Sequence, residues 1–285
     1  MRACEEKLRA LFRDAGAGEI ATPAFEYAGT LERGFGHPEK FFRLLDSDGS
    51  ILALRPELTT PAARLYATAL ADRPLPLRIY YLGQVYRQEP KHKGLFREFR
   101  QAGYECYGGD QVEEDVRAVM LASQALSRLG FDEALFEIGH VGIVDGLLDA
   151  LAPPPATRSA WKDALARKDI PALRELKAPD ELLNLLRATC GQEIRALSRN
   201  PAVSAAVDQL ETISSRLSSL PHRVVTEPAA IRHLDYYTGL VFDGLLPRSS
   251  RPVLSGGRYD RLVEQFGSPA AATGFSLELE HLLRR

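Results

Sequence analysis

Residues 77–107 read LRIYYLGQVYRQEPKHKGLFREFRQAGYECY, and this stretch decides the fold. Its first ten residues are rich in aromatic and β-branched side chains, which predicts a buried strand. The segment FRQAGYECY at its end predicts the antiparallel partner of that strand, and the charged residues between the two predict the connecting loop. We therefore expect a long hairpin at the centre of an antiparallel sheet.

The connecting loop carries five basic residues against two acidic ones, a local excess of three positive charges. A loop of this kind can hold an anion, because an arginine fork binds a carboxylate or a phosphate through two hydrogen bonds. Arg87 is the candidate for this role, since it leaves the end of an otherwise apolar strand. For Lys91 and Lys93, a solvated hairpin tip explains the charge equally well.

The second predicted strand carries Gln101 and Glu105 on one face, with Gly103 between them, because side chains alternate with a period of two. Their backbones stand roughly 13 Å apart at about 3.3 Å per residue, so the two side chains can close on the ends of a small polar ligand such as an amino acid. The alternative is an exposed face on which both residues are merely solvated. Periodicity alone slightly favours this alternative.

Two further segments contribute polar candidates. RPELTTP offers the Glu57 carboxylate as an acceptor for an ammonium group, and Thr59, for which a helix N-cap is the simpler interpretation. IRHLDYYTGLVF contributes Arg232 and the neighbours Tyr236 and Tyr237. Because adjacent strand residues point to opposite faces, we expect one tyrosine to line a pocket and the other to pack.

Composition argues against several functional classes. Lys and Arg number 36 against 38 Asp and Glu, and a net charge of −2 argues against a chain built to coat nucleic acid. Cys4, Cys106 and Cys190 are widely spaced, which favours reduced thiols over a disulfide framework, and no metal-binding pattern of Cys or His is present. No apolar stretch approaches the roughly 18 residues of a transmembrane helix. We expect a cytoplasmic protein.

The organisation along the chain predicts an α+β fold with a helical insertion. Residues 145–220 are rich in Ala and Leu, nearly free of aromatics and punctuated by prolines, which predicts several short helices. Strand patterns flank this segment, so we expect one core domain made of residues 1–144 and 221–285, with an antiparallel sheet. The last segment, residues 274–285, reads GFSLELEHLLRR and predicts a helix from its apolar spacing.

Five motifs together resemble the catalytic core of histidyl-tRNA synthetases. They are, in order, LRPELTTPAAR, YRQEPKHKGLFREFRQAGYE, RHLDYYTGLVF, SGGRYDRLVEQFG and GFSLELEHLL. The resemblance implies a class II synthetase fold, in which helices flank an antiparallel sheet, and a pocket that binds histidine. The positions that match this pocket are Glu57, Thr59, Arg87, Gln101, Glu105, Arg232, Tyr236 and Tyr237.

The same motifs depart from the synthetase pattern where that pattern holds ATP. His281 stands where the synthetases have an arginine, and Glu278 stands where they have a glycine. The resemblance implies that ATP would meet the wrong charges here. Because the sequence ends four residues after His281, the anticodon-binding domain of synthetases is not expected, and neither is a tRNA partner.

A second resemblance accounts for these departures. FEIGHVGIVDGLL and ALARKDIPALREL are similar to segments of the regulatory subunit of ATP phosphoribosyltransferase, a synthetase-like family of histidine biosynthesis. This resemblance implies a non-catalytic chain that needs no cofactor. Such a chain activates the short-form catalytic subunit and transmits feedback inhibition by L-histidine. It also implies a homodimer, paired through the region around Pro23, within a hetero-octamer.

Two other functions remain open at this point. A truncated histidine-activating ligase would exchange pyrophosphate into ATP in a reaction that depends on histidine. A scaffold with a vestigial pocket would bind its partner without any response to histidine.

Overall fold

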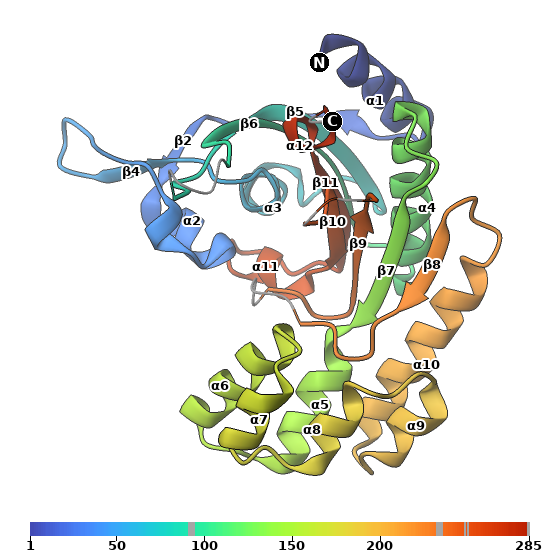
Figure 1. Ribbon diagram of the computed structural model, residues 1–285. Coiled ribbons are helices and arrows are strands. Elements are labelled where there is room, and N and C mark those ends of the chain that lie inside the picture. The colour runs from blue at the N-terminus through green and yellow to red at the C-terminus, as the bar shows by residue number, and fades with distance from the viewer. Residues whose placement is uncertain (91–94, 232–235, 248, 250, 284–285) are drawn as a thin grey trace.

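The computed structural model describes residues 1–285 except 91–94, 232–235, 248, 250 and 284–285. The strands are β1 (Gly18–Glu19), β2 (Phe25–Tyr27), β3 (Arg43–Leu45), β4 (Ile51–Leu54), β5 (Leu77–Tyr86), β6 (Glu98–Tyr107), β7 (Leu135–His140), β8 (Arg223–Thr226), β9 (Leu240–Leu245), β10 (Leu254–Arg258) and β11 (Ala272–Glu278). They form an eight-stranded sheet in the order β1-β5-β6-β11-β10-β9-β7-β8 and a three-stranded sheet in the order β2-β4-β3 (Figure 1).

Helices pack against both sheets. Those in the first 130 residues are α1 (Arg2–Asp14), α2 (Ala28–Phe35), the short 3-10 helix η1 (Pro38–Lys40), α3 (Thr59–Leu65) with its π-helical extension η2 (Tyr66–Leu70), and α4 (Gln111–Leu129). The others are α5 (Val141–Leu151), α6 (Pro155–Ala166), α7 (Ile170–Glu175), α8 (Asp180–Leu185), α9 (Gly191–Ala196), α10 (Pro201–Arg216), α11 (Asp260–Glu264) and α12 (Leu279–Leu283). In the described part of the chain, none has both the length and the apolar character needed to cross a membrane.

The predicted central hairpin is confirmed. Strands β5 and β6 pair antiparallel along their full length, from Leu77 opposite Tyr107 to Tyr86 opposite Glu98. Strand β6 also pairs with β11, so the hairpin lies inside the large sheet. Most neighbours in this sheet are antiparallel, and the predicted α+β class is confirmed.

The two faces of β6 meet different surroundings. Ala102, Tyr104 and Cys106 pack into the large apolar core under α1 and α4. Gln101 and Glu105 point to the opposite face, as the period of two requires, yet they are only 3% and 1% exposed. The alternative of a solvated polar face is therefore wrong, because α3 and α11 cover that side of the sheet.

The end of the chain differs from the sequence-based expectation. Residues 272–278 form strand β11, which pairs with β6 on one side and β10 on the other, and only α12 is helical. Phe275 and Leu277 both enter the core under α4, at a spacing of two. The prediction of a helix from residue 274 was wrong because Leu279 and Leu282, which belong to α12, gave the whole segment an apparent helical spacing.

The helices α5 to α10 lie between β7 and β8 along the chain and gather at one end of the molecule (Figure 1). Helix α10 contacts α5, β7 and α4, and apolar side chains of α6 to α9 join the same core as the large sheet. The division into a core of residues 1–144 and 221–285 and an insertion of residues 145–220 stays a prediction.

Candidate functional site

A cavity of about 250 Å³ lies on the face of the large sheet opposite α1 and α4. Seven predicted site residues line it, namely Glu57, Thr59, Arg87, Gln101, Glu105, Tyr236 and Tyr237. The eighth, Arg232, lies outside the described residues. The lining also includes side chains that sequence reasoning did not single out for this site, namely Phe35, His37, Lys40, Tyr259 and Ser276. Segments far apart in the sequence thus converge on one polar cavity.

The Glu105 carboxylate is the most deeply buried polar group of this cavity. It accepts a hydrogen bond of 2.7 Å from the Tyr81 hydroxyl and one of 2.5 Å from the Tyr259 hydroxyl. Gly274 lies opposite Glu105 on β11, where a Cβ atom would stand 1.8 Å from the carboxylate, so this position needs glycine. Burial raises the pKa of Glu105 to about 7, against the hydrogen bonds from Tyr259 and Tyr81 that lower it. At neutral pH the group is therefore poised to become a carboxylate when a cation approaches.

Glu57 caps helix α3. Its carboxylate accepts the backbone N–H groups of Thr59 at 2.5 Å and Thr60 at 2.9 Å. The prediction of Thr59 as the N-cap is wrong, because Glu57 supplies the acceptor. The Thr59 hydroxyl instead lies 3.1 Å from the Tyr81 hydroxyl, which extends the hydrogen-bond chain of Glu105. Burial raises the pKa of Glu57, while the nearby Arg87 acts to lower it.

Gln101 is held in one orientation. Its Oε1 accepts the backbone N–H of Leu58 at 2.8 Å, and its Nε2 donates to the Ser276 hydroxyl at 3.1 Å. The two bonds assign the amide orientation, because only the nitrogen can donate. A second N–H on Nε2 is available in principle for a ligand acceptor. Gln101 and Glu105 thus offer an amide and a carboxyl group on one wall of the cavity.

Two adjacent tyrosines form a further wall of the cavity. The ring centroids of Tyr236 and Tyr237 are 4.8 Å apart, and both side chains line the cavity. Strand alternation predicted only one of them there, whereas the resemblance indicated both; the alternation does not apply because both residues precede β9. Tyr237 reaches the cavity because Gly257 leaves room for it, since a Cβ atom at Gly257 would stand 2.9 Å from the Tyr237 ring. The second glycine of SGGRYD is therefore the sequence signal for the place of Tyr237.

One end of the cavity is built from charged groups. The Nη1 atom of Arg87 lies 2.6 Å from the Glu278 carboxylate, and its Nε donates to the Pro56 carbonyl at 2.8 Å. Glu278 also contacts Arg251 at 3.1 Å and the imidazole of His281. Burial acts to raise the pKa of Glu278, but Arg87, His281 and Arg251 outweigh it and lower the pKa to about 2. Glu278 is thus a carboxylate at every pH of interest.

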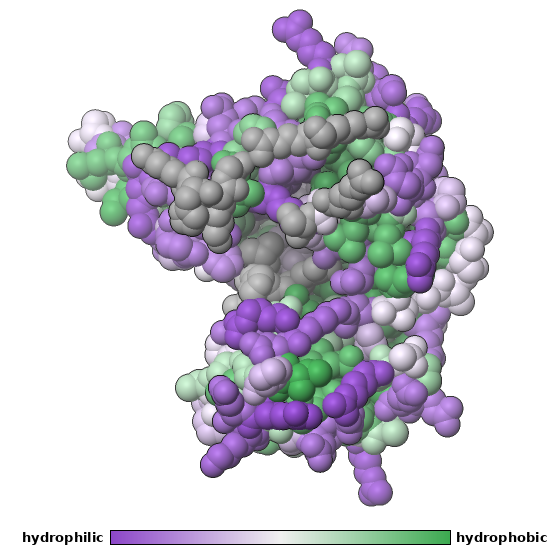
Figure 2. Space-filling view, in the orientation of Figure 1, coloured by the Kyte–Doolittle hydropathy of each residue, from purple (hydrophilic) through white to green (hydrophobic). Residues whose placement is uncertain are grey.

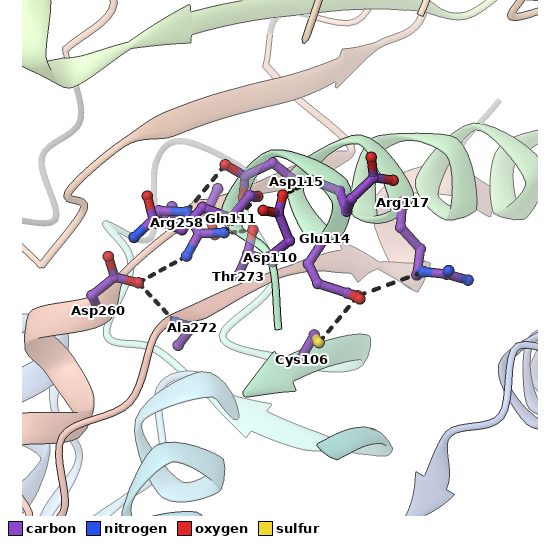
Figure 3. A network of polar contacts seen from close by, with 12 residues as sticks. Cys106, Asp110, Gln111, Glu114, Asp115, Arg117, Arg258, Asp260, Ala272 and Thr273 are labelled. Atoms are coloured by element: carbon purple, nitrogen blue, oxygen red, sulfur yellow. Dashed lines mark hydrogen bonds and ion pairs between the residues drawn. The ribbon is translucent and has the colours of Figure 1, made fainter. Parts of the chain in front are cut away.

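A buried ion-pair network joins helix α4 to the end of strand β10 (Figure 3). Arg258 is 5% exposed and donates to Asp115 through two bonds of 2.9 and 3.1 Å, and to Asp260 at 3.0 Å. Its backbone carbonyl accepts the N–H of Thr238, and its neighbour Tyr259 bonds Glu105. Through these bonds helix α4 helps to position Tyr259 and the segment that follows Tyr237.

The comparisons with known proteins agree with this architecture. The sequence model of the family described as histidyl-tRNA synthetase matches residues 1–282. Among curated proteins, the ATP phosphoribosyltransferase regulatory subunit of Moorella thermoacetica is 39% identical over 99% of this chain and 77% of that protein. The protein of the same name from Symbiobacterium thermophilum is 36% identical over 99% of this chain and 75% of that protein.

Solved structures show the same fold. A crystal structure described as an ATP phosphoribosyltransferase regulatory subunit/histidyl-tRNA synthetase from Bacillus halodurans C matches with a TM-score of 0.89 and 31% identity, covering 99% of this chain and 77% of that one. The histidyl-tRNA synthetase from Nostoc sp. PCC 7120 matches with a TM-score of 0.82 and 20% identity, covering 99% of this chain and 70% of that one. This second likeness concerns the fold alone.

Proposed function

Because this chain belongs to the family of ATP phosphoribosyltransferase regulatory subunits, built on the histidyl-tRNA synthetase fold, we propose how it exerts its regulatory role. In this proposal it activates the short-form catalytic subunit of ATP phosphoribosyltransferase and transmits feedback inhibition by L-histidine in histidine biosynthesis. The names of its relatives support a non-catalytic role with a catalytic partner.

The lining of the cavity is the observation that supports histidine as the ligand. A small zwitterion with an aromatic ring needs acceptors for its ammonium group, a flat wall for its ring and a cation for its carboxylate. Glu57, Gln101 and Glu105 supply polar groups on one side, and the tyrosine pair supplies the wall. We assign Arg87 and Arg232 to the carboxylate. Arginine has five N–H donors, so its bond to Glu278 does not by itself exhaust Arg87.

Histidine can inhibit only if it binds one state of the complex more tightly than another. The cavity must therefore be coupled to the surface that meets the catalytic subunit. The network of Arg258 supports such coupling, because it joins helix α4 to the end of strand β10, directly before Tyr259.

We further propose that the homodimer forms through the three-stranded sheet. In its register Tyr27, Leu52 and Leu44 lie side by side, so they share one face with Phe25. Phe25 and Tyr27 are 51% and 59% exposed, and Figure 2 shows apolar side chains where this sheet projects from the body. An apolar face of this kind is typical of an interaction surface. Two such dimers would fit a hetero-octamer with four catalytic chains.

A reconstitution assay tests the proposed function. The chain is mixed with a short-form ATP phosphoribosyltransferase from the same source, and product formation from ATP and phosphoribosyl pyrophosphate is followed with and without histidine. We expect stimulation that added histidine reverses. Absence of stimulation, together with histidine-dependent exchange of pyrophosphate into ATP by the chain alone, would instead establish a ligase. Stimulation without a histidine response would establish a scaffold.

A further inference from the structure

Residues 227–231 form a turn that follows strand β8 and leads toward the two tyrosines of the cavity. The backbone N–H of Glu227 donates to the Ile138 carbonyl at 2.7 Å, which holds the turn against strand β7. The Glu227 carbonyl accepts the N–H of Ala230 at 3.2 Å, and its side-chain Oε1 accepts the N–H of Ala229 at 3.1 Å. Glu227 therefore organises this segment, which we call the 227–231 turn.

This turn packs close to a wall of the cavity. Ala230 forms a small apolar cluster with Val141 and Val241, and the Tyr237 side chain packs against that cluster. The turn lies directly on strand β7, because a Cβ atom at Gly139 would stand 2.2 Å from the Ala230 Cβ. Since Tyr237 lines the cavity, the place of the turn influences the place of one cavity wall.

Lys168 ties the helices between β7 and β8 to the 227–231 turn. It follows α6, and its Nζ forms an ion pair with Oε2 of Glu227. Glu227 thus uses one carboxylate oxygen within its own turn and the other for the residue after α6. The bond to Glu227, together with the charge of Glu137, raises the pKa of Lys168, so its ammonium group is charged at neutral pH.

Lys168 adopts a backbone conformation that lysine rarely occupies. Its φ is +53°, in the left-handed region where glycine is usual at the end of a helix. Lys177 has the same φ and likewise follows a short helix, α7. The Lys177 side chain is exposed and has no hydrogen-bond or ion-pair partner among the residues that the structure describes. The two lysines therefore share their backbone strain and differ in the bond to Glu227.

We propose that Lys168 is a positioning residue for the cavity: through Glu227 it holds the 227–231 turn, and with it the Tyr237 ring, in the arrangement that binds the ligand. This inference rests on the proposed function only for the identity of that ligand. The helices between β7 and β8 are then coupled to the cavity, so a partner that displaces α6 changes the affinity of the cavity. Because coupling is reciprocal, an occupied cavity also restrains α6.

The first test is amide hydrogen exchange of the ligand-free protein, followed by mass spectrometry over residues 227–231 and 236–240. Lys168→Gly removes the ion pair and relieves the strain, whereas the control Lys177→Gly relieves the same strain with no ion pair to lose. We expect exchange over both segments to be about threefold faster in Lys168→Gly, because the turn opens more often. Lys177→Gly should exchange as the wild type does, and so should Lys168→Arg, which keeps the cation.

The second test compares histidine affinity with thermal stability. In Lys168→Gly we expect histidine affinity, measured by calorimetry, to fall about threefold. Its melting temperature should stay within about 3 °C of the wild type, because relief of the strain offsets loss of the ion pair. A lysine that only stabilised the fold would change the melting temperature and leave the affinity as it was.

Several results would overturn the inference. Equal exchange in the wild type and Lys168→Gly is one, and equal acceleration in Lys177→Gly is another. Faster exchange confined to residues 227–231 would mean that the turn does not position the cavity wall, as would unchanged affinity in Lys168→Gly where the wild type binds histidine. Wild-type protein that fails to bind histidine refutes the proposed ligand, whereas exchange over residues 236–240 still decides the role of Lys168.

Discussion

The two ends of the cavity, the inner end at Glu105 and the outer end at Glu278, surround their carboxylates with different partners. At the inner end, Glu105 is held by two neutral hydroxyl donors, and burial raises its pKa to about 7. At the outer end, Glu278 is held by Arg87 and Arg251, and its pKa is lowered to about 2. Two carboxylates on neighbouring strands thus differ because one faces hydroxyls and the other faces cations.

Glu105 therefore has no cationic partner among its hydrogen-bond donors, whereas Glu278 is already paired with arginines. A partly protonated Glu105 gains stabilisation when a ligand ammonium or imidazolium group arrives, since the cation favours its charged form. Glu278 gains nothing from a cation, because its partners are present in the protein. Ligand recognition is therefore expected to depend strongly on the inner end and weakly on Arg251, and the following predictions test this contrast.

Replacement of Glu105 should have the largest effect. Glu105→Ala removes the proposed acceptor for histidine. It also leaves the Tyr81 and Tyr259 hydroxyls without their hydrogen-bond acceptor. We expect histidine affinity to fall about 1000-fold, or roughly 4 kcal/mol, as is typical for loss of a buried charged partner. Calorimetry measures the change, with Glu98→Ala as the control because Glu98 is an exposed glutamate on the same strand. Unchanged affinity in Glu105→Ala would refute the assignment of this pocket.

The pH dependence of the free energy of unfolding should also show the titration of Glu105. Because burial raises the pKa of Glu105 from 4.5 to about 7, the folded protein holds this proton more tightly than the unfolded chain does. Its stabilising contribution is complete below about pH 4.5 and is lost as the pH rises through about 7. At about 1.4 kcal/mol per pH unit, the total loss over this range is at most about 3.5 kcal/mol.

Urea unfolding of the ligand-free protein at pH 5 and pH 7.5 measures this loss. The control is Glu105→Gln, which keeps the shape and cannot titrate. The wild type should lose up to about 3 kcal/mol more than the variant between the two pH values. Equal losses in the two proteins would mean that Glu105 does not titrate in this range, and would remove the contrast with Glu278.

Much of this site was predictable because strand periodicity is local. The alternation in FRQAGYECY placed Gln101 and Glu105 on one face, and the five motifs indicated the fold and the other lining residues. Burial of that face was not predictable from periodicity, since α3 and α11 cover it through contacts between distant segments. The pairing of Arg87 with Glu278 spans 191 residues, and no local pattern encodes it.

The smallest effect is expected at the outer end. Arg251→Gln removes one of the cations around Glu278, whereas Arg87 remains bonded to that carboxylate. The lost pair is partly exposed, and such pairs contribute little, so histidine affinity should change less than about threefold. Calorimetry under the conditions used for Glu105→Ala makes the comparison direct. A loss of tenfold or more would mean that Arg251 rather than Arg87 holds the carboxylate of histidine.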